Sequence, residues 1–101
     1  MISLDEYQYL DGWTLLHHAA NFPNPEMIKI LVDYGCNINQ QTTSMKYTPL
    51  HLAVLKKDLP ACELLLKMGA DPNLADTDFF TPMHYIVNYE YVEILDLFLT
   101  F

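Results

Sequence analysis

Apolar residues along this chain fall into short clusters that alternate with polar or proline-containing breaks and recur at nearly equal distances. Small or branched apolar residues form the first set of clusters: Ala19-Ala20, Leu52-Ala53-Val54 and Ile86-Val87. Such residues suit a short helix that is pressed closely between two neighbours. The pattern therefore predicts three short helices, one in each third of the chain.

A longer apolar segment follows each cluster after a break. These segments predict helices over residues 26–34, 60–68 and, roughly, 91–100. Their apolar residues cover most of the helix circumference, which implies packing on more than one side. Because only stacking buries that much apolar surface, the pattern predicts a row of stacked helix pairs.

Nearly the same four residues stand at the start of each pair, at intervals of 33 or 34 residues. The three tetrapeptides are Thr14-Leu15-Leu16-His17, Thr48-Pro49-Leu50-His51 and Thr81-Pro82-Met83-His84. Each Thr can cap a helix by accepting a backbone N–H, and a Pro at the first helical position loses no hydrogen bond. The His stands where the far member of a capping box would stand, which indicates a local bond back to the Thr. An internal period of this size is typical of stacked-repeat folds.

A second marker keeps the same register. Gly35 and Gly69 each lie 21 residues after their own Thr and are expected to end the second helix in the left-handed conformation. Asn24 and Asp58 can cap the start of that helix. The similar segments after each Gly predict an extended finger: Cys36-Asn37-Ile38-Asn39 and Ala70-Asp71-Pro72-Asn73.

These markers together resemble the ankyrin repeat over about residues 11–101. The resemblance implies an all-α fold, an ankyrin-repeat solenoid of stacked helix-turn-helix units with extended finger loops. It divides the chain into a segment at 1–9 and repeats at 10–42, 43–75 and 76–101. The first segment is either the finger of a preceding repeat, since residues 2–5 echo residues 73–76, or one helical turn capped by Ser3 with Glu6. The third repeat is truncated before its closing finger.

Some positions depart from the family pattern. Leu15 replaces a Pro, and the turn between the helices has Pro23, Lys57 or Glu90 where the family usually has Gly. Only Asp11-Gly12 keeps the hairpin turn pair. The sequence therefore leaves open the shapes of the fingers at 43–46 and 78–79.

Charge and composition narrow the possible partners. The chain has 5 Lys plus Arg against 13 Asp plus Glu, a net charge of -8, which repels phosphate backbones and anionic lipids. We therefore expect no nucleic-acid and no membrane partner, and no membrane span or secretory signal is visible. Cys36 and Cys62 lie at different phases of the repeat, unlike a disulfide framework or a zinc knuckle. This favours an intracellular location, cytoplasmic or nuclear.

No pattern of catalytic, cofactor-binding or metal-binding residues stands out. His17, His51 and His84 occupy equivalent places on helices expected roughly 8–10 Å apart. Zinc needs its nitrogens about 2.0–2.1 Å from one point, so this ladder cannot converge on an ion. Cys62 lies among apolar positions, where an inert thiol is expected. We therefore expect no enzyme activity, no metal and no cofactor.

An aromatic residue precedes each Thr: Trp13, Tyr47 and Phe80. In the ankyrin resemblance this phase lies at the base of the finger and faces the concave binding surface. The resemblance carries further residues to that surface: Leu10, Asp11, Asn21, Phe22, Met45, Leu55, Lys56, Asp78, Asn88 and Tyr89. Large rigid side chains are typical anchors of a bound partner. The alternative interpretation is that the rings only pack between fingers.

The resemblance also implies one modification site. Leu65, Asp71 and Asn73 look like the acceptor segment that asparaginyl hydroxylases modify in many ankyrin repeats, although Pro72 departs from the usual aliphatic residue. The alternative role of Asn39 and Asn73 is to stabilise their own finger through a side-chain hydrogen bond.

Three functional hypotheses follow. The first is a non-catalytic module that binds a basic or neutral protein or peptide on its concave face and fingers. The second is a spacer or regulatory segment of a larger multidomain protein, such as an enzyme or channel. The third is self-association through the C-terminal end, whose apolar residues from Ile94 to Phe101 lack a polar cap.

Overall fold

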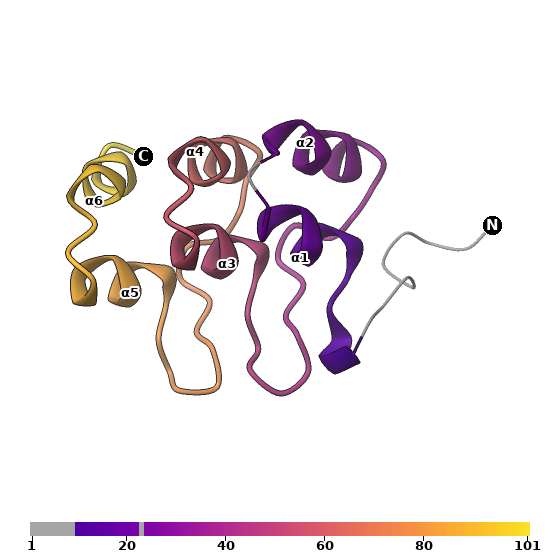
Figure 1. Ribbon diagram of the computed structural model, residues 1–101, viewed down its shortest axis with the longest axis horizontal. Helices are drawn as coiled ribbons and strands as arrows, with labels where there is room; N and C mark the ends of the chain where they lie inside the picture. The colour runs from indigo at the N-terminus through magenta and orange to yellow at the C-terminus, as the bar shows by residue number, and fades with distance from the viewer. Residues whose placement is uncertain (1–9, 23) are drawn as a thin grey trace.

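The computed structural model describes residues 10–22 and 24–101. Six α-helices occur in these ranges: α1 (Leu15–Ala20), α2 (Pro25–Asp33), α3 (Pro49–Leu55), α4 (Leu59–Lys67), α5 (Pro82–Asn88) and α6 (Val92–Leu99). Figure 1 shows them as three pairs in a row, with long extended loops projecting from one side. These loops are the fingers, and their arrangement confirms the predicted all-α solenoid of stacked units. The segment at 1–9, expected to echo a preceding finger, lies outside the described residues, as does Pro23.

The inner helices begin where the sequence predicts. Thr14 Oγ1 accepts from the backbone N–H of His17, and His17 Nδ1 accepts from the backbone N–H of Thr14 at 3.0 Å. Thr48 and His51 form the same reciprocal pair. In the third repeat the Thr81 N–H donates to His84 Nδ1 at 3.0 Å. These bonds satisfy donors that a helix start otherwise leaves unpaired.

The outer helices begin and end one residue or so from the predicted bounds. Asp58 Oδ1 accepts from the Ala61 N–H at 3.2 Å, which confirms its cap role. The equivalent prediction for Asn24 is wrong, because its side chain makes no capping bond and Pro25 alone opens α2. Gly35 and Gly69 end α2 and α4 with φ of 101° and 96°, as expected for left-handed caps.

In the turns that lack glycine, other residues adopt the left-handed backbone conformation that glycine usually takes. Lys57 and Glu90, between the helices of the second and third pairs, have φ of 55° and 59°. Lys46 and Phe79, near the tips of two fingers, have φ of 57° and 66°, like Gly12 at 70°. The fingers whose shapes the sequence left open therefore share a left-handed residue at the equivalent position, although this region is unfavourable for a residue with a Cβ.

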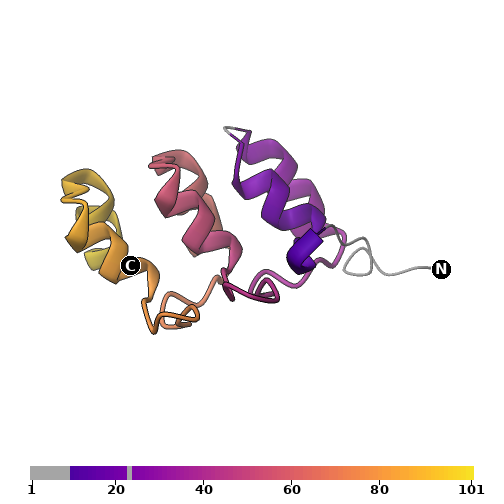
Figure 2. The ribbon, with the colours of Figure 1, turned by 60° about the horizontal axis from the view of Figure 1, so that its bottom comes forward.

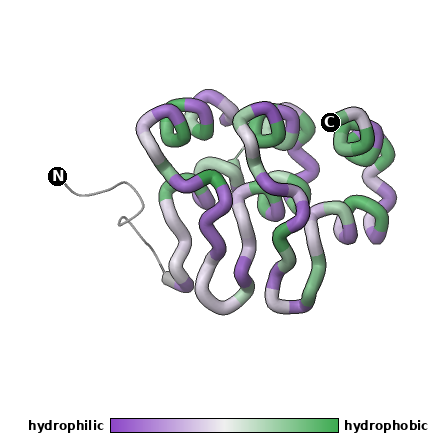
Figure 3. The backbone as a smooth tube through the Cα atoms, turned by 180° about the vertical axis from the view of Figure 1, so that it is seen from behind, coloured by the Kyte–Doolittle hydropathy of each residue, from purple (hydrophilic) through white to green (hydrophobic). Residues whose placement is uncertain are grey.

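The core lies between successive pairs rather than at one centre. Inner helix packs on inner helix, α1 on α3 and α3 on α5, and the outer helices follow the same order. Figure 2 shows the row from below, with each pair beside the next. The largest fully buried apolar side chains lie at these junctions: Leu16, Ile28, Leu50, Val54, Leu65, Ile86 and Ile94. In Figure 3 hydrophobic positions follow the helices, and α6 at the C-terminal end is mainly hydrophobic.

Candidate functional site

The three aromatic residues of the predicted surface lie at equivalent places at the bases of successive fingers. Each ring packs on the histidine of its own repeat: the centroid distances to His17, His51 and His84 are 6.0, 5.8 and 5.7 Å. Trp13 and Tyr47 are half-buried, and Phe80 is 44% exposed. Each ring therefore packs on a neighbouring residue and is also partly accessible to solvent.

The other residues predicted to bind a partner differ in exposure. Five are exposed: Phe22, Lys56, Asp78, Asn88 and Tyr89. Four are half-buried: Asp11, Asn21, Met45 and Leu55. The side chain of Leu10 lies outside the described part of the chain. Their role in binding stays a prediction.

Two histidines reach beyond their own repeat to hold the aromatic row. His17 Nε2 lies 2.8 Å from the Gln40 carbonyl oxygen and 2.9 Å from that of Tyr47. His51 Nε2 lies 2.9 Å from the carbonyl oxygen of Phe80. A carbonyl can only accept, so Nε2 carries the proton and donates, while Nδ1 accepts from the Thr N–H. The sequence predicted the local bond only, and the bond to the next finger was missed.

Burial lowers the pKa of both histidines below the ordinary value of 6.5. Desolvation is the main cause, and the backbone carbonyls that accept from Nε2 oppose it. The neutral ring is the form that fits, because it can accept at Nδ1 and donate at Nε2 together. His17 and His51 therefore position the backbone of Tyr47 and Phe80 as neutral groups.

Hydrogen bonds also tie neighbouring fingers together. The Thr43 N–H donates to the Asp11 carbonyl at 2.7 Å, and the Ser44 N–H donates to Asp11 Oδ1 at 2.8 Å. In the next pair of fingers, the Thr77 N–H donates to the Met45 carbonyl at 2.9 Å. Asp11 and Met45, both predicted to bind a partner, thus also have a structural role. The finger surface is held in shape before any partner arrives.

The third finger is organised around Asp76, which is 3% exposed. Its Oδ1 accepts from the N–H groups of Asp78 and Phe80 at 2.9 and 3.0 Å, and Oδ2 accepts from the Tyr85 hydroxyl. Burial raises the pKa of Tyr85, and the hydrogen bond to the neighbouring Asp76 carboxylate raises it further. The buried charge is therefore satisfied by donors from both its own finger and helix α5.

An aromatic cluster that the sequence analysis missed surrounds this network. Phe80 meets Tyr85 edge-on at 5.5 Å, and Tyr85 stacks on Tyr89 at 6.3 Å with an interplanar angle of 12°. Tyr89 in turn stacks on Tyr91 at 5.6 Å. Lys57 Nζ lies 5.4 Å from the centre of the Tyr91 ring. The four-residue spacing of Tyr85, in α5, and Tyr89, at the C-cap of α5, was the available signal.

The two asparagines behave differently. Asn39 Oδ1 accepts from the Asp71 N–H at 2.8 Å, so the expectation that it stabilises its own finger is wrong, because its partner belongs to the next repeat. Asn73 is exposed, and its backbone N–H donates to Asp71 Oδ1 at 2.9 Å. Its hydroxylation stays a prediction.

No group of three or more His, Cys, Asp or Glu in residues 10–22 and 24–101 could hold a metal ion. Burial, with Asp58 as a secondary cause, raises the pKa of Cys62 to about 12, which keeps it a thiol at neutral pH. No helix in the part of the chain that the structure describes is long and apolar enough to cross a membrane.

Comparison with known proteins gives one family and several relatives. The family model described as Ankyrin repeats (3 copies) matches residues 2–76, more than half of the chain. An ankyrin repeat protein of Acanthamoeba polyphaga mimivirus is 35% identical over 85 residues, 84% of this chain and 11% of that protein. A palmitoyltransferase of Mus musculus is 39% identical over 71 residues, 70% of this chain and 11% of the enzyme. An alpha-latrotoxin of Latrodectus hasselti is 35% identical over 77 residues, 75% of this chain and 6% of the toxin. The chain therefore spans a small fraction of the length of these relatives.

Proposed function

Because this chain belongs to the ankyrin repeat family, whose repeats are generally protein-interaction modules, we propose that it is a non-catalytic module that binds a protein or peptide. The binding surface is the concave face with the finger bases. The aromatic row of Trp13, Tyr47 and Phe80 forms its centre, and Phe22, Lys56 and Tyr89 extend it along the inner helices.

The observation that carries this proposal is the fixed row of three partly exposed rings. Aromatic side chains dominate binding energy at interfaces because they bring large area with few rotatable bonds. The backbone behind Tyr47 and Phe80 is already held by His17 and His51 at 2.9 Å. A partner would therefore pay little to order this surface, which favours affinity.

The charge of the chain favours a basic or neutral partner. With a net charge of -8, an approaching cationic segment is attracted and an anionic one is repelled. Asp78, on the third finger, adds an exposed carboxylate beside the aromatic row. Added salt should slow association with a basic partner more than it shortens the lifetime of the complex.

A second candidate is a spacer or regulatory role within a larger protein. The palmitoyltransferase and the alpha-latrotoxin favour it, because each carries a stretch similar to this chain as a small part of its length. For either role we propose a cytoplasmic or nuclear location. Cys62 is a free, buried thiol, which suits a reducing compartment.

Selection of displayed peptides tests the binding function. Peptides selected on the 101-residue chain should lose at least tenfold in affinity for a double variant, Trp13→Ala with Tyr47→Ala, because two anchors are removed. Ile30→Ala is the matched control, since Ile30 is an exposed apolar residue on the outer helix α2 and lies outside the predicted surface. Circular dichroism checks that all variants stay helical. Equal binding by the double variant and the control would contradict the site.

A further inference from the structure

At the C-terminal end of the row, α5 and α6 expose residues whose equivalents in the second repeat are buried against the next helix pair. We call it the end face: Met83, His84 and Val87 of α5 with Leu99 of α6. In the second repeat the equivalent residues, Leu50, His51, Val54 and Leu66, are at most 8% exposed. In contrast, Val87 is 60% exposed and Leu99 70%. Met83, His84 and Val87 also line an open cavity of about 450 Å³.

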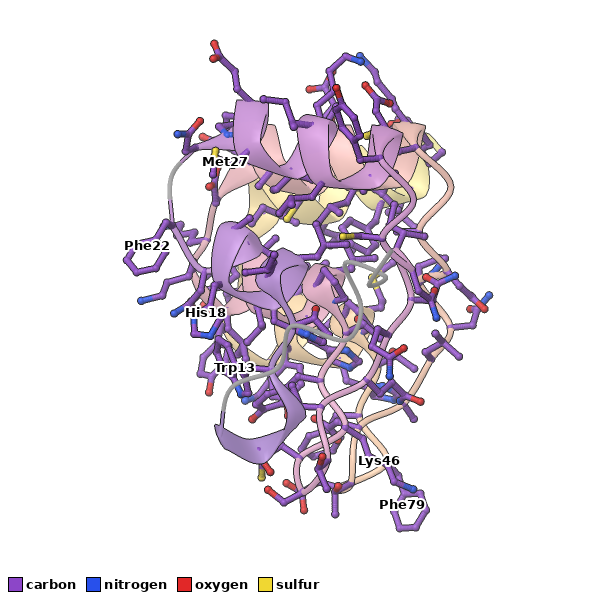
Figure 4. All side chains as sticks on the ribbon, turned by 90° about the vertical axis from the view of Figure 1, so that its right-hand side faces the viewer. Trp13, His18, Phe22, Met27, Lys46 and Phe79 are labelled. Atoms are coloured by element: carbon purple, nitrogen blue, oxygen red, sulfur yellow. The ribbon has the colours of Figure 1, made fainter. Side chains whose placement is uncertain are left out.

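The N-terminal end shows the complementary surface, which we call the start face: Leu15 and Ala19 of α1 with Met27 and Leu31 of α2. Met27 is 48% exposed, whereas the residues at its position in the later repeats, Ala61 and Ile94, are 0% and 2% exposed. The four residues line a cavity of about 300 Å³. Figure 4 views the molecule from this end, where His18, Phe22 and Met27 lie along one edge.

A hydrogen bond sets the register at each internal junction. His17 and His51 donate from Nε2 to the carbonyl of the aromatic residue in the following repeat, at 2.9 Å in both cases. His84 holds the Thr81 N–H at its Nδ1 in the same way, but it is exposed, whereas His17 and His51 are fully buried. The carbonyl in the corresponding place at the other end of the chain belongs to Trp13. One chain thus carries both halves of a junction.

We propose that the end face of one copy binds the start face of a second copy, head to tail, continuing the row. Helix α5 then packs on α1 of the next copy and α6 on α2, as α3 packs on α5 and α4 on α6 within the chain. His84 Nε2 donates to the Trp13 carbonyl. The occupant is a second copy because the internal junctions of this chain already pair surfaces built from the equivalent positions.

Two properties distinguish this head-to-tail contact from a symmetric dimer and from a contact held by ion pairs. The two faces differ, so the contact does not close on itself and growth continues past the dimer. Each copy carries a net charge of -8, so the copies repel each other and association depends on apolar burial. Added salt screens the repulsion and should strengthen the contact, the opposite of a contact held by ion pairs.

The test is sedimentation of the full chain and of variants blocked at one face. The mean mass should rise with concentration and exceed that of a dimer as the concentration approaches about 1 mM, and it should rise further with added NaCl. Val87→Glu blocks the end face and Met27→Glu the start face, and each variant alone should remain monomeric. Mixed together, they should form a one-to-one dimer and stop there, since each still has one intact face.

Controls separate this result from misfolding and from other geometries. Ile30→Glu introduces the same charge at an exposed site outside both faces and should associate like the parent. Melting curves should be closely similar for the three variants at low concentration, because the side chains of Met27, Ile30 and Val87 are 48%, 51% and 60% exposed. A strictly monomeric parent at about 1 mM overturns the proposal. So does self-association of Met27→Glu alone, which would indicate a symmetric end-to-end contact.

Discussion

At the scale of single residues, His17 and His51 each join two levels of the fold. One ring nitrogen accepts from the Thr at the start of its own helix, and the other donates to the next finger. Protonation of the ring would leave Nδ1 unable to accept, and the buried Thr N–H would lose its partner. The fold therefore depends on the neutral form of both rings.

This dependence predicts acid sensitivity. The folded-state pKa values of His17 and His51 are lowered below 6.5, so the unfolded chain binds more protons below that pH. The free energy of unfolding should be at its full value above pH 7 and should decrease as the pH falls through 6.5 toward the folded pKa values. Urea unfolding between pH 7.5 and 5.5 measures it. His51→Gln should reduce the slope, and a flat profile for the parent chain would contradict the assignment.

Backbone strain at the finger tips predicts opposite effects at two equivalent positions. A Cβ on Gly12, at φ +70°, would lie 2.3 Å from Thr43 Oγ1, so Gly12→Ala should lower the free energy of unfolding by about 1–3 kcal/mol. Lys46 has the same left-handed backbone with a Cβ, which costs roughly 1–2 kcal/mol. Lys46→Gly should therefore gain about 0.5–1 kcal/mol after the added entropy of the unfolded chain.

Thermal and urea unfolding of these variants checks both values. Lys46→Ala is the control, because it removes the side chain beyond Cβ and keeps the Cβ that is unfavourable in this conformation. If Lys46→Ala stabilised the chain as much as Lys46→Gly, the strain would not be the cause.

At the scale of elements, a finger is held to its helix pair by a few buried polar groups. Asp76 is the clearest case, because three donors from the third finger and α5 converge on one carboxylate. Asp76→Ala leaves the Phe80 N–H, the Asp78 N–H and the Tyr85 hydroxyl without this acceptor. We expect a loss of about 2–4 kcal/mol in the free energy of unfolding.

Two milder variants define the origin of that loss. Tyr85→Phe removes one donor and should cost about 1 kcal/mol, and Asp76→Asn keeps one acceptor oxygen and should fall between the two. Hydrogen exchange should report faster opening of the Phe80 amide in Asp76→Ala. Unchanged exchange there would indicate that the finger is held by packing instead.

Elements formed by local interactions could be predicted from the sequence. The Thr and His of each cap lie three residues apart, and the Gly caps follow their helices directly, so both patterns are visible along the chain. Contacts between repeats could not be predicted in this way. The bonds from His17 to the Tyr47 carbonyl and from the Asp71 N–H to Asn39 span 30 and 32 residues. Their geometry exists only after stacking.

In the candidate site, too, local and periodic features could be predicted from the sequence, whereas contacts between repeats could not. The phase of Trp13, Tyr47 and Phe80 is a periodic feature, so the sequence could place them at equivalent positions. Residues with a second role were harder to recognise, because the bond from Ser44 to the Asp11 carboxylate depends on two fingers lying side by side. Phe79 lies apart from the predicted surface. It is 84% exposed in a left-handed turn, and Figure 4 shows it with Lys46 at the finger tips, away from the edge that carries Trp13.

At the scale of the whole molecule, stability is distributed over junctions between neighbouring repeats. In such a row each unit contributes through its own folding and through the surfaces it shares with the next. The contribution of a residue to the free energy of unfolding should therefore depend on whether a neighbouring repeat packs against it. Leu66 and Leu99 occupy the same position in the second and third repeats, yet they are 8% and 70% exposed.

Substitution of these two residues compares a junction between two repeats with the end face, which no repeat of this chain covers. Leu66→Ala should lower the free energy of unfolding by about 2–4 kcal/mol, because it leaves a cavity between two helix pairs. Leu99→Ala should change it by less than about 0.5 kcal/mol in dilute solution, where no copy covers the end face. At concentrations where copies stack, the parent gains stability from association and Leu99→Ala gains less, so the difference between them should grow with concentration. Urea unfolding at two protein concentrations measures all three quantities, and a large loss for Leu99→Ala in dilute solution would mean that this face is already covered within the chain.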